Sequence, residues 1–313
     1  MINQVTLPDS KPVWDRVYAA NPLQAPFLIW AWHNDWTRIL AGEWTSYCLI
    51  IDDDVIAPLA KNGDTVIFSG GDEIADYLDL IGPEEKKFGA WEQIIPFLKK
   101  QGVKNIRLRN VPQHSPTLSF FQKLKGAVAE QEDTTPIITL PASWEAYVGS
   151  LPKKYRHELE RKIRKFDREH PDAELIKSVD PEGDLRLLFE LMEKDKSKRA
   201  FLTPDMKTFF TAITQSFKNH ISLLYIRSGD KNMAATFSFV FEDTYYLYNS
   251  GFDKECCANA GYYLKAASLK RAIEKGIKHY NFLQGNERYK YELGGVDFPV
   301  YRITHQLSES TVS

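Results

Sequence analysis

The C-terminal part of this chain concentrates polar and aromatic side chains that can do chemistry. The stretch NFLQGNERYKYELGG, residues 281–295, follows an amphipathic segment and a short apolar run. It contains Glu287, Tyr289 and Lys290 within four positions. A carboxylate can accept a proton, an ammonium can stabilise a developing oxyanion, and a phenol can protonate a leaving group. The stretch is therefore predicted to be an active-site wall, with the solvated end of a helix as the alternative.

A second candidate feature is the glycine that opens a predicted helix at 261–276. The turn SGFDKECCANAGYYL, residues 250–264, leads into this helix. Gly261 lets the backbone come close to a ligand, and the amides of Gly261, Tyr262 and Tyr263 would point outward at the positive end of the helix dipole. This arrangement suits a phosphate or pyrophosphate group. A tight turn without a ligand is the alternative.

A third feature is a basic helix predicted within SLPKKYRHELERKIRKFDREH, residues 150–170, with Ser150 as N-cap and Pro152 in the first turn. Its apolar stripe is Tyr155, Leu159, Ile163 and Phe166. Its basic face is Lys154, Arg161, Lys165 and Arg168. The functional interpretation is a cradle for a phosphorylated substrate, a nucleotide or a lipid-linked sugar. The interpretation that we favour is a solvated face, because Glu158 with Lys162 and Glu160 with Arg164 form i, i+4 pairs.

The composition limits the classes of protein that the chain can represent. Its 313 residues are 43% hydrophobic, which predicts two domains with sizeable cores. The net charge of −2 argues against a general nucleic-acid or membrane coat. No signal peptide and no apolar run long enough to span a membrane are seen. The three cysteines, Cys48, Cys256 and Cys257, have neither a disulfide nor a zinc spacing. We expect a soluble, cytoplasmic protein without a structural metal.

The elements that must position these residues fall into two halves. The acidic and Thr/Pro-rich stretch EQEDTTPIITLPAS, residues 130–143, is the candidate boundary. In the first half, β-branched and aromatic runs predict strands, and apolar spacing predicts helices. The predicted strands there are 44–52, 64–70 and 103–111, and the predicted helices are 26–41, 72–81 and 91–102.

The second half predicts a strand, two helices, three antiparallel strands, the helix at 261–276, a strand, a short helix and a final strand at 299–307. Hairpins are expected around 229–231 and 242–243. The helix at 261–276 lies between two strands and ends at Gly276, which suits a left-handed C-cap. It is predicted to be a right-handed crossover that joins parallel neighbours. A crevice is expected where such a sheet changes from antiparallel to parallel.

The order of the elements and the sequences of several stretches resemble those of GNAT-fold acyltransferases. More narrowly, the chain is similar to the cellulose-biosynthesis-associated (CelD/BcsL-like) acetyltransferases, which are related to Fem-type aminoacyltransferases. The matching stretches are residues 150–166, residues 245–290 and, in the first half, FLIWAWHNDW, IAPLA and GGDEIADYLDL. The resemblance spans about residues 25–303. It implies an α/β (α+β) chain of two tandem GNAT-like domains, each a mixed, mostly antiparallel sheet flanked by helices. Residues 1–138 would lie on the acceptor side and residues 139–313 would hold the acyl-CoA site.

The resemblance also implies roles for individual residues, with acetyl-CoA or another acyl-CoA as co-substrate and no metal. The catalytic candidates are Tyr289, Lys290, Tyr248 and Glu287. The donor-binding candidates are Asn249, Gly251, Ala260, Gly261, Tyr262, Tyr263 and Leu264. The acceptor-binding candidates are Asp76, Tyr77, Lys154, Tyr155, Arg156 and Gln284. The sequence departs from the family pattern twice, with Ala260-Gly261 for Pro-Gly and Asn281 for an aspartate, and the second change leaves the general base unassigned.

These observations predict an acyl-CoA-dependent N-acyltransferase acting on an amino sugar or another amine of an envelope or exopolysaccharide precursor. One alternative is a Fem-like aminoacyltransferase that uses aminoacyl-tRNA, which the net charge of −2 and the lack of a coiled-coil arm disfavour. Another is a non-catalytic scaffold with a GNAT-like crevice. No DNA partner and no integral membrane segment are expected. The acceptor, the acyl chain and the oligomeric state stay open.

Overall fold

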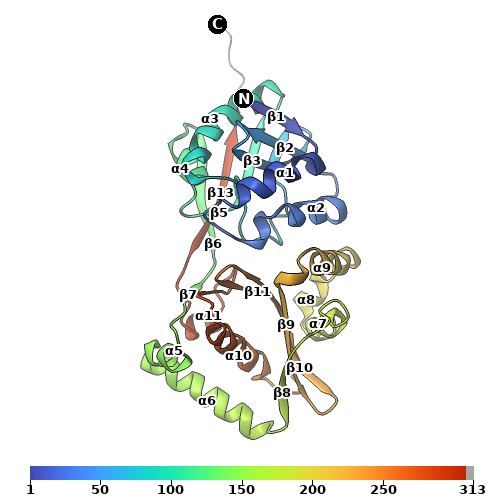
Figure 1. The fold of residues 1–313 in the computed structure, drawn as a ribbon, viewed down its shortest axis with the longest axis vertical. Coiled ribbons are helices and arrows are strands. Elements are labelled where there is room, and N and C mark those ends of the chain that lie inside the picture. Colours follow the sequence, from blue (N-terminus) through green and yellow to red (C-terminus); the bar gives the residue numbers. More distant parts are fainter. Residues whose placement is uncertain (308–313) are drawn as a thin grey trace. The chain divides into compact units, whose positions relative to one another are not determined.

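The structure, a computed structural model, describes residues 1–307 (Figure 1). These residues form two compact units. Unit 1 contains Met1–Thr134 and residues 298–307, and unit 2 contains Thr135–Asp297. The chain therefore passes from one unit to the other twice. The division at 134/135 lies close to the boundary predicted at 138/139, and the segment from Phe298 packs with unit 1.

Unit 1 is built on a seven-stranded sheet. Its strands are β1 (Ile2–Val5), β2 (Thr45–Ile51), β3 (Val55–Asn62), β4 (Thr65–Phe68), β5 (Asn105–Pro112), β6 (Ala127–Thr134) and β13 (Pro299–Gln306). They lie in the order β1-β2-β3-β4-β5-β13-β6. Only β4 and β5 pair in parallel. The first six residues of β3 are all buried, as expected for a central strand covered on both faces.

The helices of unit 1 are α1 (Leu7–Tyr18), the 3-10 turn η1 (Pro26–Leu28), α2 (Trp30–Ile39), α3 (Glu84–Lys100) and α4 (Pro116–Lys123). Side-chain hydroxyls start two of them: Thr6 accepts the amide of Asp9 before α1, and Ser115 accepts the amide of Thr117 before α4. The helices bury large aromatic side chains in the core. Trp14, Trp32 and Trp91 are completely buried.

The helix predicted at 72–81 is wrong, because this stretch forms turns and irregular backbone. The side-chain amide of Asn110 donates to the carbonyl oxygens of Asp72 at 2.8 Å and Ala75 at 2.6 Å. The carbonyl of Asn110 in turn accepts the amide of Leu78 at 3.0 Å. These long-range bonds satisfy backbone groups that a helix would have paired internally. An apolar pattern that suits a helix therefore belongs to a buried irregular segment.

The last strand was predicted to lie in the second half, and this is also wrong. In the structure β13 lies between β5 and β6 of unit 1, antiparallel to both. The stretch 130–143, predicted as a boundary, holds the end of β6 and all of β7 (Ile137–Thr139). Arg302 of β13 donates to the carboxylate of Glu130 on β6 at 2.6 Å. Strand pairing is non-local, so the alternation of one strand does not reveal which sheet it joins.

Unit 2 is built on a six-stranded sheet in the order β7-β12-β11-β10-β9-β8. Its further strands are β8 (Ala173–Lys177), β9 (Ile221–Ser228), β10 (Lys231–Phe241), β11 (Thr244–Phe252) and β12 (His279–Asn281). The two predicted hairpins are confirmed, because β9, β10 and β11 are consecutive antiparallel neighbours. The predicted parallel crossover is also confirmed, because β11 pairs in parallel with β12.

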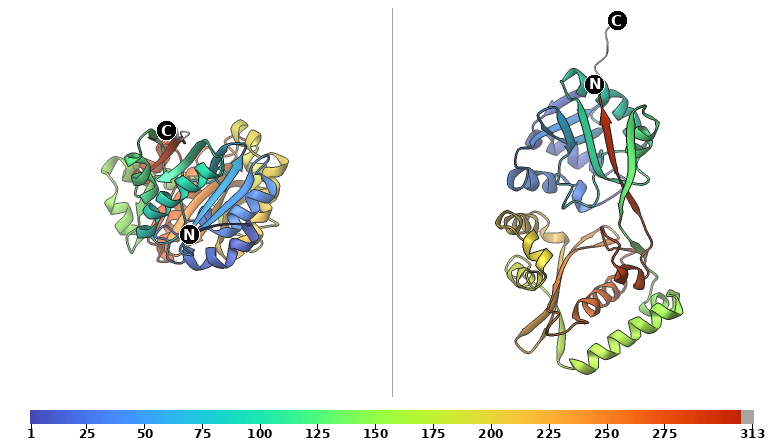
Figure 2. Two further views of the ribbon diagram at one scale, coloured as in Figure 1. Left: turned by 90° about the horizontal axis from the view of Figure 1, so that it is seen from above. Right: turned by 180° about the vertical axis from the view of Figure 1, so that it is seen from behind.

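Helices cover both faces of this sheet (Figures 1 and 2). They are α5 (Trp144–Ser150), α6 (Lys153–Glu169), α7 (Leu185–Met192), α8 (Lys196–Phe201), α9 (Pro204–Ser216), the 3-10 turn η2 (Lys218–His220), α10 (Ala260–Glu274) and α11 (Arg288–Glu292). The layer of α7, α8 and α9 lies on one face, and α10 with α6 lies on the other. The predicted N-cap Ser150 is wrong, since Ser150 ends α5 and Pro152 precedes α6.

Candidate active site

The crevice that the sequence predicts for unit 2 is expected where β11 and β12 separate. The two strands pair only from Thr244 and His279 to Tyr246 and Asn281. Beyond this point β11 continues beside β10 as far as Phe252, whereas the chain leaves β12 directly after Asn281. Two parallel strands that diverge at their carboxyl ends leave an opening in the sheet, which is a common position for a ligand.

A β-bulge lies in β11 at this opening. Phe237 of β10 is paired with Asn249, and the next residue, Ser238, is paired with Leu247. Tyr248 is thus the extra residue of β11. A bulge frees one residue from the ladder and changes the direction of its backbone groups, and bulges often lie next to active sites. The backbone around Tyr248 and Asn249 is therefore well placed to present an amide to a ligand between β11 and β12.

The start of α10 offers further backbone donors. The amide of Ala260 donates to the carbonyl of Cys257 and that of Tyr263 to Asn259. Within residues 1–307, the amides of Gly261 and Tyr262 have no hydrogen-bond acceptor. Of the three amides in the prediction, that of Tyr263 is used inside the protein, which leaves those of Gly261 and Tyr262 as candidate donors to a ligand.

The side chains at this helix start do not point to a common ligand. The ring of Tyr263 stacks on Phe166 of α6 at 3.9 Å between ring centroids, and Lys162 lies 3.8 Å above the ring of Tyr262. Gly261 packs closely against Phe252, since an added Cβ would come within 2.8 Å of the Phe252 ring. Donor binding at residues 260–264 would therefore use backbone groups, with Ala260 and Leu264 buried beneath them.

The stretch 281–295 forms a tightly held loop followed by α11. The side-chain oxygen of Asn281 accepts the amide of Leu283 at 2.8 Å, and Leu283 has a positive φ of 58°. A left-handed backbone at a leucine is unusual and needs such support. Position 281 therefore shapes the loop. Its carboxamide also has no basic site for a proton, so it cannot replace a carboxylate base.

Lys290 holds the same loop from the other side. Its ammonium group, on a side chain only 2% exposed, donates to the carbonyl oxygens of Leu283 at 2.9 Å, Gly285 at 3.1 Å and Gln284, and it pairs with Glu287 at 2.9 Å. These contacts occupy the donors of Lys290. The predicted catalytic lysine is thus a residue that organises the loop, and Glu287 is its exposed partner.

A residue that the sequence analysis missed lies beside this loop. Lys265, one turn into α10, is 6% exposed. Its ammonium group lies 4.7 Å from the centre of the Tyr289 ring and 6.0 Å from that of Phe252, and its one hydrogen bond is a long contact of 3.4 Å to the carbonyl of Gly261. Burial, with Lys198 and Lys290 nearby, lowers the pKa of Lys265 to about 7, although Glu287 opposes this.

The two predicted catalytic tyrosines lie on opposite faces of the sheet. The ring of Tyr289 packs at 6.0 Å from Phe282, on the side of α10. Burial and the neighbouring Glu287 raise the pKa of Tyr289, so its hydroxyl keeps its proton at neutral pH. The ring of Tyr248 instead packs against Phe210 of α9 at 5.8 Å. The structure therefore groups Tyr289 with Lys265, Glu287 and Lys290, and places Tyr248 apart from them.

Gly251 has a packing role. An added Cβ would come within 2.4 Å of the backbone nitrogen of Met192 and 2.6 Å of the carbonyl carbon of Leu191. Gly251 therefore lets β11 approach α7 closely. Asn249, which precedes it by two residues, lies partly exposed beside the bulge.

Two of the four residues on the basic face of α6 form ion pairs with neighbouring carboxylates. Arg161 lies 2.8 Å from Glu158, and Lys165 lies 3.8 Å from Glu169. Both of the predicted i, i+4 pairs are present at 3.5 Å. Lys162 also pairs at 3.0 Å with Glu292, a buried carboxylate of α11 that the sequence analysis missed.

The remaining acceptor-binding candidates come from three separate segments: the start of α6, the loop that Lys290 holds, and a buried stretch of unit 1. At the start of α6, Lys154 is exposed, whereas Tyr155 and Arg156 are half-buried. Gln284 is half-buried in the loop that Lys290 holds. In unit 1, Tyr77 is completely buried at 6.3 Å from Phe27, so its side chain belongs to the core.

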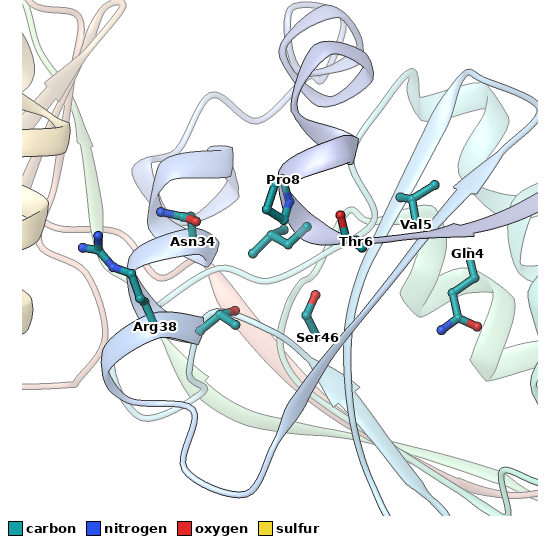
Figure 3. Close-up of a pocket in the computed structure, with 9 residues that line it drawn as sticks. Gln4, Val5, Thr6, Pro8, Asn34, Arg38 and Ser46 are labelled. Atoms are coloured by element: carbon teal, nitrogen blue, oxygen red, sulfur yellow. The ribbon is translucent and has the colours of Figure 1, made fainter.

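Unit 1 also has a groove of about 640 Å³. Figure 3 shows side chains of β1, the start of α1, α2 and β2 around it, including Thr6, Asn34, Arg38 and Ser46. Neither Asp76 nor Tyr77 lines this groove. Arg38 is held by Asp35 at 3.2 Å.

Two searches of the described residues gave no candidates. Within residues 1–307 there is no group of three or more His, Cys, Asp and Glu side chains that could hold a metal ion. No helix in this range is both long enough and apolar enough to cross a membrane.

Comparisons with known proteins agree with this geometry. Residues 153–291 match the family model of the acetyltransferase (GNAT) domain. The matched range includes α6, the bulged β11, α10 and the loop that Lys290 holds. The match covers less than half of the chain and supports an acyltransferase, with a GNAT-like domain over residues 153–291. No curated protein sequence matches the chain.

Solved structures share the fold over nearly all of the chain. A conserved protein of unknown function from Bacteroides thetaiotaomicron is 13% identical with a TM-score of 0.67, covering 98% of this chain and 100% of that chain. FemX is 10% identical with a TM-score of 0.64, covering 98% and 96%. A tandem GNAT protein from the clavulanic acid biosynthesis pathway is 11% identical with a TM-score of 0.54, covering 99% of each chain. The predicted fold class, two mixed sheets flanked by helices in a tandem GNAT arrangement, is confirmed.

Proposed function

We propose that the chain transfers an acyl group, in the simplest case acetyl, from an acyl-CoA to an amine acceptor. The observation that carries this proposal is the opening between β11 and β12, with the bulge at Tyr248 on one side and the free amides of Gly261 and Tyr262 at the start of α10. Free amides at a helix N-terminus suit the donor's diphosphate. An amide at the bulge suits a thioester oxygen that gains charge during the reaction.

The chain's own residues would then supply the remaining chemistry. The Tyr289 hydroxyl, protonated at neutral pH, would donate a proton to the departing thiolate. Lys290 would act indirectly, by fixing the carbonyls of residues 283–285 and the position of Glu287. Glu287, with its side chain 57% exposed, would accept a proton through water. Unit 1 would contribute to the acceptor side.

The acceptor class follows from the resemblance to the cellulose-biosynthesis-associated acetyltransferases. We propose an amino sugar, or the amine of an envelope or exopolysaccharide precursor, and a cytoplasmic reaction because acyl-CoA donors are made there. The fold shared with FemX supports a second candidate, an aminoacyltransferase that uses aminoacyl-tRNA. A scaffold without activity is the third outcome, which the structural use of Asn281 favours.

Calorimetry with acetyl-CoA separates these functions. The proposal predicts a one-to-one complex, and release of free CoA on addition of a panel of amino sugars. Tyr289→Phe should bind acetyl-CoA like the wild type and lose about 100-fold in turnover, since removal of a general acid typically costs that much. Filter binding with aminoacyl-tRNA at several salt concentrations addresses the second candidate. Absence of heat with acetyl-CoA, together with tRNA binding, would replace the first function by the second.

A further inference from the structure

Lys265 is a buried amine that no carboxylate neutralises. No ion pair involves it within residues 1–307. Its side chain, 6% exposed, lies between the Phe252 ring at the end of β11 and the Tyr289 ring on α11. Its position is therefore at the opening between β11 and β12, one helical turn after the free amides of α10.

The charged groups around Lys265 come from three other elements. Lys198 of α8, also mostly buried, donates to the carbonyl of Ser250 on β11. Lys290 of α11 is bound to loop carbonyls, and Glu287, the carboxylate of this group, pairs with Lys290. Lys254, whose ammonium lies 5.7 Å from the centre of the Phe252 ring, is neutralised by Asp195 at 2.9 Å. Lys265 therefore faces two further ammonium groups and one carboxylate that is already paired.

Such surroundings favour the uncharged form of an amine. Burial disfavours the ammonium ion, and neighbouring cations disfavour it further. These are the two conditions that turn a lysine into a nucleophile at neutral pH. The lowered pKa of Lys265, at about 7, agrees with this geometry.

We propose that Lys265 is a self-acylation site of the donor cleft, at which the side-chain amine accepts the acyl group of a bound acyl-CoA. In this step the Lys265 nitrogen attacks the thioester carbonyl, a C–N bond forms, the C–S bond breaks, and the amine proton passes to the CoA thiolate. The product is an uncharged amide. This inference rests on the proposed function, because it requires acyl-CoA to bind between β11 and β12.

The modification would close the cleft to a second donor. The acylated side chain is longer than the amine and lies against the Tyr289 and Phe252 rings, so it occupies the space that the donor needs. We expect acetylated protein to bind acetyl-CoA at least about ten-fold more weakly than unmodified protein, a difference of about 1.4 kcal/mol. Self-acylation would therefore limit turnover when acyl-CoA is abundant and the acceptor is scarce.

The test uses the full chain with acetyl-CoA alone, followed by peptide mass spectrometry. Lys270 is the matched control, since it lies on the same helix with its side chain 50% exposed beside Glu274. At pH 7 an ordinary exposed lysine is less than about 0.1% uncharged. Acetylation of Lys265 should therefore exceed that of Lys270 by on the order of 100-fold, even allowing for the weaker nucleophilicity of a less basic amine. The rate at Lys265 should rise up to about pH 7 and then level off.

Two variants and parallel calorimetry complete the test. Lys265→Arg keeps a cation that cannot be acylated in this way, and Lys265→Met removes the charge; both should fold, bind acetyl-CoA and lose the dominant acetylation site. Binding of acetyl-CoA with acetyl groups spread evenly over surface lysines would overturn this inference and leave the proposed function intact. Absence of acetyl-CoA binding to the wild type would overturn the proposed function, and this inference with it.

Discussion

Buried lysines occur in both units, and their surroundings differ. In unit 1, Lys87 is 2% exposed and pairs at 2.9 Å with Asp79, which also accepts the hydroxyls of Ser115 at 2.8 Å and Thr117 at 2.6 Å. In unit 2, Lys265 is also buried, at 6% exposed, and has no carboxylate partner. A buried charge with a complete set of partners fixes a structure, whereas one without them is available to a ligand.

Lys290 is intermediate between these two residues. Lys290 has a full set of acceptors, which are three loop carbonyls and an exposed carboxylate. Its ammonium group therefore holds the shape of a loop beside the expected donor site. Lys87 therefore has a structural role, Lys290 organises a loop beside the expected donor site, and Lys265 is the lysine available to a ligand. Changing each of them or its partner tests these roles.

The largest effect is expected for Asp79→Ala in unit 1. This change leaves the Lys87 ammonium buried without a counter-charge and removes the acceptor of Ser115 and Thr117. The free energy of unfolding should fall by about 3–5 kcal/mol, the usual cost of breaking a buried ion pair on one side. Urea unfolding measures it. The exposed pair of Arg186 and Glu190 is the control, and Glu190→Ala should cost less than about 0.5 kcal/mol. Equal losses of unfolding free energy for both variants would show that the buried ion pair contributes no more stability than the exposed one.

A smaller loss of stability is expected for Lys290→Met. The carbonyls of Leu283, Gln284 and Gly285 lose their common donor, and each unsatisfied buried group costs about 1 kcal/mol or more, which predicts about 2–3 kcal/mol in total. The loop should also lose its shape, so hydrogen exchange of amides 283–287 should become faster while that of β9 and β10 stays slow. Unchanged exchange in the loop would contradict the organising role of Lys290.

Lys265→Met should raise the free energy of unfolding, whereas the two preceding variants lower it. In the wild type the folded amine has a pKa of about 7, well below that of an unfolded lysine. Below about pH 7 both states are protonated, and the folded state carries the full cost of burying the ammonium. Above that pH the folded amine is neutral, so the cost declines by roughly 1.4 kcal/mol per pH unit until the unfolded lysine also loses its proton.

The variant should therefore be more stable than the wild type at pH 6.5, and this advantage should shrink as the pH rises to 9. Urea unfolding of both proteins at several pH values gives the difference directly. Lys270→Met, at the exposed control position on α10, should show no such dependence. Parallel stability curves for Lys265→Met and the wild type would show that Lys265 has an ordinary pKa.

The sequence predicted the strands and helices of unit 2 better than the roles of its individual side chains. The hairpins, the crossover helix and Gly276 beyond its C-terminus, with φ of 73°, follow from periodicity and turn residues, which are local. The role of Lys290 depends on which carbonyls a folded loop presents, and no spacing reveals that. Lys265 left a usable signal: Gly261, Lys265, Ser268 and Ala272 share one face of α10, and all four are buried.

Unit 1 was predicted less well, for a related reason. The stretch 72–81 has helical spacing. However, two of its backbone carbonyls accept hydrogen bonds from the side chain of Asn110, which lies 35 or more positions away in the sequence. Likewise, β13 joins a sheet whose other strands precede it by more than 160 residues. Both errors come from non-local hydrogen bonds that override local preference.

The central claim is that acyl-CoA binds in unit 2 between β11 and β12. Hydrogen exchange with and without saturating acetyl-CoA tests it most directly, because the ligand should slow exchange of amides at 246–252, 260–264 and 281–290. The Asp79 network and the groove of unit 1 serve as internal references and should not change. Two results would contradict the account. One is slowed exchange in unit 1 alone; the other is unchanged exchange in all three segments although calorimetry shows that acetyl-CoA binds.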